Sequence, residues 1–473
     1  MEKVTKLLPI GAALGAGAVL LVLAGCAAGP DYREPRITVP ARFDGTTAGQ
    51  YSTNAPLLRW WGTFSDPYLT NLVAIALTNN LDLRVAEANI REARALRREA
   101  QFDFLPVVNA SGGYREGLRS EAAAPGLSRG ERRTGLFDAG FDALWELDLF
   151  GRVRRSVEAR TAQTEAAMAG LENFYVTLTS EMARNYFELR GLQNELGVAL
   201  KNAENQKQTL AITQARLEGG RGTELDVARA RAQWTATLAL IPPLQSGISS
   251  AIHRLSVLTG QQPNALKAAL EKESPLPPLP SLVNIGNPEE LLRRRPDIRV
   301  AERNLAAATA GIGIVTADLF PRVTFNGNIA LESSSFTGLG AAGSETWSFG
   351  PRISWAALDY GHVRARIRAA GARADASLAQ YEQTVLSALE ETENALVDFG
   401  REQERMNYLQ QTVESSRTAS QLAQQRFDAG AVDFLVVLDA ERALLDAEDQ
   451  LARSQTRTLT SLVSVYKALG GSI

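Results

Sequence analysis

The sequence predicts an α+β membrane protein that assembles as a trimer and carries an internal tandem duplication. Three observations lead to this fold class: the two halves of the chain repeat one another, each half contains an unusually long helical stretch, and each half contains segments whose hydropathy alternates with period two. Four strands cannot close a barrel, but three copies supply about twelve. We therefore expect a twelve-stranded β-barrel, with four strands per chain, continuous with a long α-helical coiled-coil barrel.

The first 25 residues have the composition of an export signal. Two lysines precede an apolar run at 7–23, which ends in Leu-Ala-Gly-Cys at 23–26. This ending resembles the lipobox of bacterial lipoproteins, in which the cysteine thiol is acylated before the chain is cleaved. An uncleaved signal anchor is the alternative, because the apolar run is near the minimum length that spans a bilayer. We predict a cleaved signal peptide at 1–25 and lipid attachment at Cys26.

Cys26 is the only cysteine of the chain, so it has no disulfide partner and no cysteine-rich metal site around it. Several acyl chains on one residue would anchor the protein stably. Ala27 follows the cysteine, whereas an aspartate there would indicate retention at the inner membrane. We therefore expect the anchor to lie in outer-membrane lipid.

The composition argues against several other classes of protein. The formal net charge of −3 leaves no large basic field for nucleic acid. The two histidines, His253 and His362, stand in unrelated contexts, and the sequence has no metal-ligand spacing, nucleophile elbow or phosphate loop. We predict no enzymatic activity, no cofactor and no nucleic-acid partner.

Self-comparison shows that the chain is a tandem duplication. Four segments recur in the same order in the second half: 81–87, 105–106, 145–154 and 216–220 match 296–302, 320–321, 355–364 and 426–430. The offset changes by about five residues between the second and third segments, where we expect a loop. Four ordered matches are hard to obtain by chance.

The matches divide the mature chain into four parts. Residues 26–57 are polar and rich in turn-forming residues, and we expect an extended tether that leads from the lipid anchor. The first structural repeat is expected at 58–272, with two strands at about 106–150, and the second at 288–473, with two strands at about 321–360. Between the repeats, residues 273–287 contain Pro-Leu-Pro-Pro-Leu-Pro, which predicts a stiff linker.

Each repeat contains a long proline-free stretch, at 152–218 and at 362–428. At about 1.5 Å per residue, each predicts a helical rod on the order of 100 Å. Apolar residues between 171 and 203 follow the three-four spacing of a coiled-coil seam. Gly220 and Gly430 are expected to end these helices. Return helices are expected at about 224–259 and 433–469, the first broken at Pro242-Pro243, and shorter helices at about 68–104 and 288–319.

Apolar and polar residues alternate in the segments between these helices, most clearly at 137–147, 323–331 and 347–355. Such alternation is typical of barrel strands with lipid on one side and a wet lumen on the other, although a soluble sandwich shows it too, and Pro351 weakens the last strand. Four residues are expected to shape the junctions. Pro106 and Pro321 should turn the chain from helix to strand, and Gly151 and Gly361 from strand back to helix.

Together these features resemble the TolC-type outer-membrane efflux proteins, in particular their lipoprotein branch, the NodT family. The most specific motifs are Trp-Trp-x-x-Phe-x-Asp-Pro at 60–67, Leu-Leu-Arg-Arg-Arg-Pro-Asp-Ile at 291–298, and Tyr-Lys-Ala-Leu-Gly-Gly at 466–471. The resemblance implies a homotrimer in the outer membrane whose helical barrel extends into the periplasm. It also implies two partners, a periplasmic adaptor (membrane fusion protein) and an inner-membrane RND transporter, and passive exit of small molecules through the duct.

The same resemblance points to a periplasmic gate. In the family, the helix tips close the mouth of the duct with acidic rings, and residues 430–440 match that segment. Asp439 falls on one acidic position, whereas Val436 occupies the other, and Arg229 is the counterpart of Asp439 in the first repeat. Leu435 and Val436 are expected to form an apolar constriction beside Asp439. A solvated carboxylate and ordinary coiled-coil packing are the alternatives.

Two other functions remain open on the sequence alone. A periplasmic adaptor lipoprotein also combines a lipobox with helical hairpins, but it has one hairpin and lacks this duplication. A structural envelope lipoprotein would not conduct ions.

Overall fold

The structure, a computed structural model, describes residues 27–45, 51–52, 54, 57, 59–280 and 282–471. The predicted signal peptide and Cys26 lie outside the described residues. The chain divides into two compact units, and both long helices run through both of them. Among the described residues, unit 1 comprises 27–36, Asn89–Met168 and Val300–Tyr381, and unit 2 comprises those within Ile37–Ala88 and Ala169–Arg299 and from Glu382 to 471.

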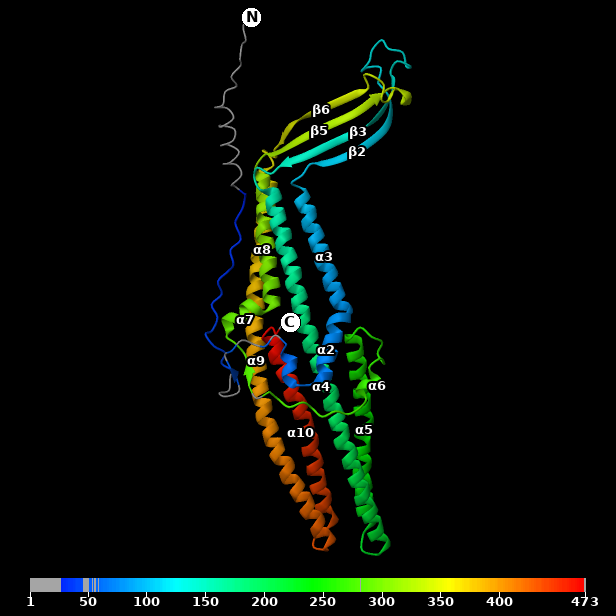
Figure 1. Cartoon of the computed structure of the whole chain (residues 1–473), viewed down its shortest axis with the longest axis vertical. Coiled ribbons are helices and arrows are strands. Elements are labelled where there is room, and N and C mark those ends of the chain that lie inside the picture. The colour runs from blue at the N-terminus through cyan, green and yellow to red at the C-terminus, as the bar shows by residue number, and fades with distance from the viewer. Residues whose placement is uncertain are drawn as a thin grey trace. The chain divides into compact units, whose positions relative to one another are not determined.

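Unit 1 contains an antiparallel sheet of four strands in the order β2-β3-β5-β6 (Figure 1). The strands are β2 (Val107–Leu118), β3 (Arg133–Leu147), β5 (Arg322–Ser333) and β6 (Glu345–Ser354). The predicted strands are therefore present in both repeats, and β6 forms with Pro351 inside it, opposite Phe325 of β5. The central pair, β3 with β5, joins the first repeat to the second.

The sheet has one apolar and one polar face. Phe141, Ile329 and Trp347 are opposite one another on three neighbouring strands, and they are 61%, 70% and 69% exposed. On the other face, the adjacent row contains Asp142, Asn328 and Ser348. Within the described part of the chain no other element covers this apolar row, whereas the two sheets of a sandwich bury their apolar faces against each other.

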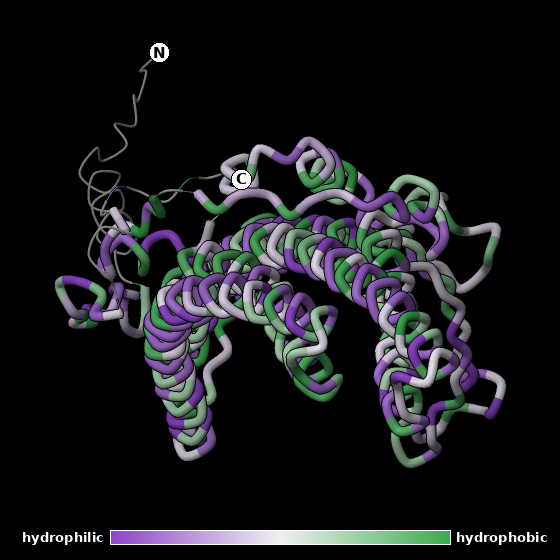
Figure 2. The backbone as a smooth tube through the Cα atoms, turned by 90° about the horizontal axis from the view of Figure 1, so that it is seen from below, coloured by the Kyte–Doolittle hydropathy of each residue, from purple (hydrophilic) through white to green (hydrophobic). Residues whose placement is uncertain are grey.

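The two long helices are α4 (Arg152–Glu218, 67 residues) and α9 (Tyr360–Asp428, 69 residues). Figure 2 shows that hydrophilic and hydrophobic residues are interspersed along the helices. Among the described residues, no helix combines the length and the apolar character needed to cross a membrane.

Both long helices end at a glycine with a left-handed backbone, Gly220 (φ 69°) and Gly430 (φ 73°). Each glycine N–H bonds to the carbonyl three residues back, and the next N–H reaches the carbonyl five residues back, at 2.8 Å in both turns. This Schellman arrangement satisfies the last carbonyls of the helix. The return helices follow as α5 (Glu224–Leu258) and α10 (Phe434–Ala468).

The predicted break at Pro242-Pro243 is wrong, because α5 is continuous through both prolines. A proline removes the hydrogen bond to the carbonyl four residues earlier. Both prolines and both carbonyl-bearing residues, Leu238 and Ala239, are exposed, so water can satisfy the freed carbonyls.

Each predicted shorter helix is divided in two, at matching positions of the two repeats. Asn80 separates α2 (Pro67–Asn79) from α3 (Leu81–Phe102), and Arg295 separates α7 (Pro288–Arg294) from α8 (Pro296–Thr316). The Asn80 side chain accepts from the N–H groups of Asp82 and Leu83 at 2.9 and 3.1 Å, which caps α3. A 3₁₀ turn, Ala317–Leu319, follows α8.

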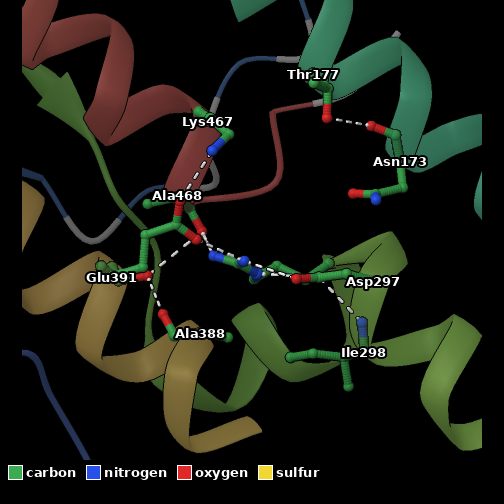
Figure 3. Close-up of polar contacts among 10 residues, drawn as sticks. Asn173, Thr177, Asp297, Ile298, Ala388, Glu391, Lys467 and Ala468 are labelled. Atoms are coloured by element: carbon green, nitrogen blue, oxygen red, sulfur yellow. Dashed lines mark hydrogen bonds and ion pairs between the residues drawn. The ribbon is translucent and has the colours of Figure 1, made fainter. Parts of the chain in front are cut away.

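Arg295 is the centre of a polar cluster in unit 2. Its guanidinium donates to the carbonyl of Ala468 at 2.8 Å and to the carboxylates of Asp297 and Glu391 at 2.7 Å each. Lys467 lies 3.1 Å from the other oxygen of Glu391, and Figure 3 shows these partners converging from α8, α9 and α10. The side chain of Arg295 is 9% exposed, so its charge is compensated inside the protein.

The aromatic residues of the Trp-Trp motif form part of the core of unit 2. Trp60 stacks on Tyr466 with ring centroids 5.0 Å apart, and Phe64 lies 4.8 Å from Phe187. The motif opens a 3₁₀ turn, Trp60–Phe64, and Asp66 then caps α2 and accepts a hydrogen bond from Tyr186 at 2.7 Å. The family motifs are thus structural here.

Several described residues of the extended segment after residue 26 contact other elements of their own unit. In unit 1, Ala28 donates to the carbonyl of Phe150 at 2.9 Å, and Arg155 pairs with Asp31 at 2.6 Å. In unit 2, the N–H groups of Asp44 and Gly45 donate to Glu393. Two short strands, β1 (Tyr51–Ser52) and β4 (Val283–Asn284), pair in parallel, which links this segment to the predicted linker.

Candidate gate at the helix tips

The two helical hairpins of the chain pack against each other near their turns. Arg216 at the end of α4 lies over the ring of Phe427 at the end of α9, 3.9 Å from its centroid, and donates to the Phe427 carbonyl at 3.3 Å. The tip cluster is the buried apolar group beside this contact. It consists of Leu210, Ala230, Ala423, Phe427, Phe434, Val437 and Leu438.

The first two turns of α10 present two different faces. Phe434, Val437 and Leu438 are buried in the tip cluster. Leu435 and Val436 are 44% and 46% exposed, and Asp439 is exposed as well. Because positions i, i+1 and i+4 share a helix face, the structure brings these three predicted gate residues together on the side away from the cluster.

Arg229 is half-buried on α5, and within the described part of the chain no ion pair joins it to Asp439. The first repeat also contains an acidic residue that the sequence interpretation missed. Asp226, the counterpart of Val436, accepts from Thr223 Oγ1 at 2.7 Å and completes a capping box at the start of α5. The spacing Thr-x-x-Asp is a known sign of such a cap. This carboxylate is therefore committed to helix capping.

Three polar contacts above the tip cluster join the hairpins. Arg442 donates to Gln233 at 2.8 Å, and Thr209 donates to Glu441 at 3.0 Å. Burial raises the pKa of Glu441, and the hydrogen bond from Thr209 only partly opposes the shift. Its second carboxylate oxygen is buried without a hydrogen-bond partner. Further along, Glu448 accepts from Asn202 at 3.2 Å.

The predicted junction residues lie where the helices meet the sheet. Pro106 and Pro321 immediately precede β2 and β5. Gly151 has φ 79° directly before α4, a conformation that other residues rarely adopt. Gly361 differs, because it lies in the first turn of α9 and has no positive φ. At this position a sharp glycine return is not required.

Two tryptophans make the same contact at the junctions of the two repeats. The indole N–H of Trp145 donates to the carbonyl of Phe104 at 2.9 Å, and that of Trp355 donates to the carbonyl of Leu319 at 3.1 Å. Both rings are otherwise exposed, which fits side chains with one apolar part and one hydrogen-bonded end.

The residue after Cys26 also lies at a junction. A Cβ atom on Gly151 would come within 2.6 Å of the Ala27 backbone, so the start of the described chain packs directly on the strand-to-helix turn. Among the described residues, no group of three or more His, Cys, Asp or Glu side chains is placed to hold a metal ion.

Comparison with known proteins gives one consistent family. The model for the outer membrane efflux protein family matches residues 72–261 and 287–471, which correspond to the two repeats. Nodulation protein T of Rhizobium leguminosarum bv. trifolii is 32% identical over 442 residues, covering 92% of each chain. The solvent efflux pump outer membrane protein SrpC of Pseudomonas putida is 32% identical over 460 residues, covering 96% of each chain.

Solved structures show the same fold. The outer-membrane channel OprN superimposes with a TM-score of 0.89 at 45% identity, over 94% of this chain and 99% of that chain. CusC, whose structures are described in terms of transmembrane channel formation, superimposes with a TM-score of 0.83 at 29% identity, over 94% of this chain and 100% of that chain.

Proposed function

We propose that this chain, which belongs to the outer membrane efflux protein family, is the passive exit duct of a tripartite pump. Its place as an outer-membrane channel follows from the family and from its similarity to solved outer-membrane channels. The proposal adds a homotrimer, a periplasmic adaptor and an inner-membrane RND transporter that supplies the energy. Small molecules would then cross the periplasm and the outer membrane inside the trimer.

The observation that carries this proposal is the sheet with one uncovered apolar face and two open edges, β2 and β6. An apolar face of this kind needs lipid, and open edges in lipid need partners. Three copies would pair their edges into a closed barrel with the polar row of Asp142, Asn328 and Ser348 facing the lumen. A periplasmic adaptor or a structural lipoprotein has no use for such a sheet.

A passive role also agrees with the cargo named for relatives. Proteins 30–32% identical to this chain are named for efflux of solvents, pyoverdine and cations. One architecture therefore serves chemically different cargo, as expected if substrate choice is made by the inner-membrane transporter.

We further propose that Asp439, Leu435 and Val436 line the periplasmic gate, with Arg229 as a basic neighbour. Three copies of one carboxylate around an axis would attract cations and would repel one another. The exposed face that these residues share, opposite the tip cluster, supports this role.

Single-channel conductance in planar bilayers tests both proposals. Wild-type trimers should show a small, cation-preferring conductance, and Asp439→Asn should raise it or abolish the preference for cations. Glu414→Gln, which removes an exposed carboxylate of α9, is the matched control. An unchanged Asp439→Asn channel would refute the gate assignment alone. Silence of both the wild type and a variant with a disrupted tip, in verified trimers, would refute the duct.

A further inference from the structure

We infer that neighbouring copies of this chain are joined by an ion pair between Arg84 of one copy and Glu382 of the next. This inference rests on the proposed trimer and specifies how its helices meet. It follows from the duplication, because the chain already contains the same ion pair once, between its own two repeats.

The internal pair joins the short helix of the second repeat to the long helix of the first. Arg299 on α8 pairs with Glu172 on α4, and both belong to unit 2. In unit 1, Arg303 and Glu165 continue the same helix–helix contact at 3.0 Å. The short helix of one repeat therefore lies along the long helix of the repeat before it.

The matched residues of this contact are the same in the other repeat. The segment 81–87 matches 296–302, which places Arg84 at the position of Arg299. The match of 216–220 with 426–430 extends back along the proline-free helices and places Glu382 at the position of Glu172. An arginine and a glutamate are thus repeated at the two positions that form the internal pair.

The pairing of the strands keeps the same residue correspondence between the two repeats. Val107 is opposite Leu144 in the first repeat, and Arg322 is opposite Ser354 in the second. These are the same positions under the offsets that relate the helices. The correspondence is therefore a structural one and is not confined to the sequence.

Arg84 and Glu382 are both exposed, and within the described residues neither side chain makes an ion pair or a hydrogen bond. Other repeated acidic positions of the long helices are already occupied inside the chain. Glu181 is paired with Arg254, and its counterpart Glu391 is paired with Arg295. The two free charges are of opposite sign and lie on the two helices that closure would bring together.

Closure of a ring would bring α3 of one copy next to α9 of its neighbour. In a ring of three chains the repeats alternate, so the first repeat of one chain follows the second repeat of another. Helix α3 would then lie along α9 of the neighbour as α8 lies along α4 inside the chain. Arg84 would meet Glu382 of the second copy as Arg299 meets Glu172.

The same transposition gives the register at which β6 would pair with β2 of the neighbour. Phe141 is opposite Ile329 in the internal pair of β3 with β5. The matching residues are Pro351 on β6 and Tyr114 on β2, so these two should be opposite each other between chains. This register provides a second, separate position at which the interface can be probed.

Charge reversal tests the ion pair in the full-length protein in detergent. Arg84→Glu and Glu382→Arg should each lower the temperature at which the trimer dissociates, because each places like charges together at three interfaces. The double variant should recover most of the loss. The matched control exchanges the charges of the internal pair, Arg299→Glu with Glu172→Arg. It shows how well an exchange of arginine and glutamate is tolerated when both residues belong to one chain.

Proximity is tested with a short bismaleimide, because an arginine–glutamate pair holds its backbones too far apart for a disulfide. Arg84→Cys with Glu382→Cys should give covalently linked trimers, whereas Arg84→Cys with Glu390→Cys should not. Conducting trimers that show neither cross-linking nor rescue would overturn the ion pair and leave the duct intact. Wild-type protein that never forms trimers would overturn the duct and the ion pair together.

Discussion

The side-chain amide of Asn80 donates a hydrogen bond of 2.9 Å to the main-chain carbonyl of Leu258. At the matching place in the second repeat, Arg295 donates to the carbonyl of Ala468 at 2.8 Å. Both bonds join the start of a short helix to the end of a return helix. The duplication has therefore kept this helix-to-helix joint while changing the residue that makes it.

Replacing Asn80 should weaken the joint in the first repeat. Asn80→Ala removes both the cap of α3 and the bond to Leu258, and we expect it to lower the free energy of unfolding by about 1–3 kcal/mol. Asn80→Ser keeps a capping oxygen and should lose less. Denaturant unfolding monitored by circular dichroism measures both, and equal losses would show that the cap contributes nothing.

In the second repeat the joint depends on charge. Arg295→Met leaves Asp297 and Glu391 without their buried partner and should cost about 3 kcal/mol, since Glu391 remains partly solvated. Arg295→Lys keeps the charge but loses the paired hydrogen-bond geometry. Its stability should therefore lie between that of the wild type and that of Arg295→Met. A loss no larger for Met than for Lys would argue against the charge compensation.

The same cluster should make stability depend on pH in the acid range. Burial opposes ionisation of Glu391, but hydrogen bonding to Arg295 and the charge of Lys467 outweigh it, so the pKa of Glu391 lies below its usual value. A lowered pKa contributes stability above the unfolded pKa of about 4.3, and this contribution is lost as the pH falls through the folded pKa. Glu391→Gln should be less stable at neutral pH and should flatten the decline below about pH 4.

Much of the fold could be predicted from the sequence, because it depends on periodicity. The proline-free stretches became α4 and α9, and the alternating segments became strands. Both signals are local: a helix repeats every 3.6 residues and a strand every two, whatever lies around them. The duplication strengthened each assignment, because the same pattern occurs at matching positions of both repeats.

The predictions failed at positions where the surrounding structure determines the local backbone conformation. Pro242 and Pro243 do not break α5, because their freed carbonyls lie on an exposed face, which composition does not reveal. Gly361 resembles Gly151 in sequence, yet only Gly151 has a left-handed backbone. The repeats are equivalent in pattern but differ in local geometry.

At the helix tips, the family resemblance was enough to propose Leu435, Val436 and Asp439 as gate residues, and the structure shows that all three are exposed. The contacts behind them were missed. The stacking of Arg216 on Phe427 joins residues from different repeats, and no local pattern indicates such a contact.

Glu441 should give the tip a pH dependence opposite to that of Glu391. Its pKa is raised by burial, so its stabilising contribution is complete below the unfolded pKa of about 4.3 and is lost as the pH rises through the folded pKa. Glu441→Gln should therefore stabilise the protein by about 1 kcal/mol at neutral pH and have little effect near pH 4. Unfolding of both proteins across this range measures the difference, and a constant offset at every pH would contradict the prediction.

The predicted lipid anchor can be tested by metabolic labelling with a fatty acid. Cys26→Ser should abolish the label, and because Ala27 packs at the Gly151 turn, it should leave channels that conduct normally when reconstituted. Gly151→Ala should instead keep the label and destabilise the protein, since the added methyl group meets Ala27 and the φ of 79° is strained for alanine. Label on the Cys26→Ser protein would place the acylation elsewhere.

The contacts of Arg216 should hold the two hairpin tips together. It lies over Phe427, donates to the Phe427 carbonyl and approaches Asp428 at 3.6 Å, so three contacts are lost in Arg216→Ala. Arg216 is half-buried, and contacts of this kind together contribute about 1–2 kcal/mol. This corresponds to roughly a 5- to 30-fold change in the ratio of open to closed tips.

We expect Arg216→Ala to affect gating and not assembly. Arg216 lies at the tips of the hairpins, far from the Arg295 cluster and from the core around Trp60. Open probability of Arg216→Ala channels in planar bilayers should rise, while the temperature of trimer dissociation stays close to that of the wild type. Arg221→Ala is the matched control, since Arg221 is an exposed arginine of the same turn whose side chain makes no hydrogen bond or ion pair within the described residues. Equal effects of the two substitutions would show that loss of positive charge, and not of the contact with Phe427, opens the tips.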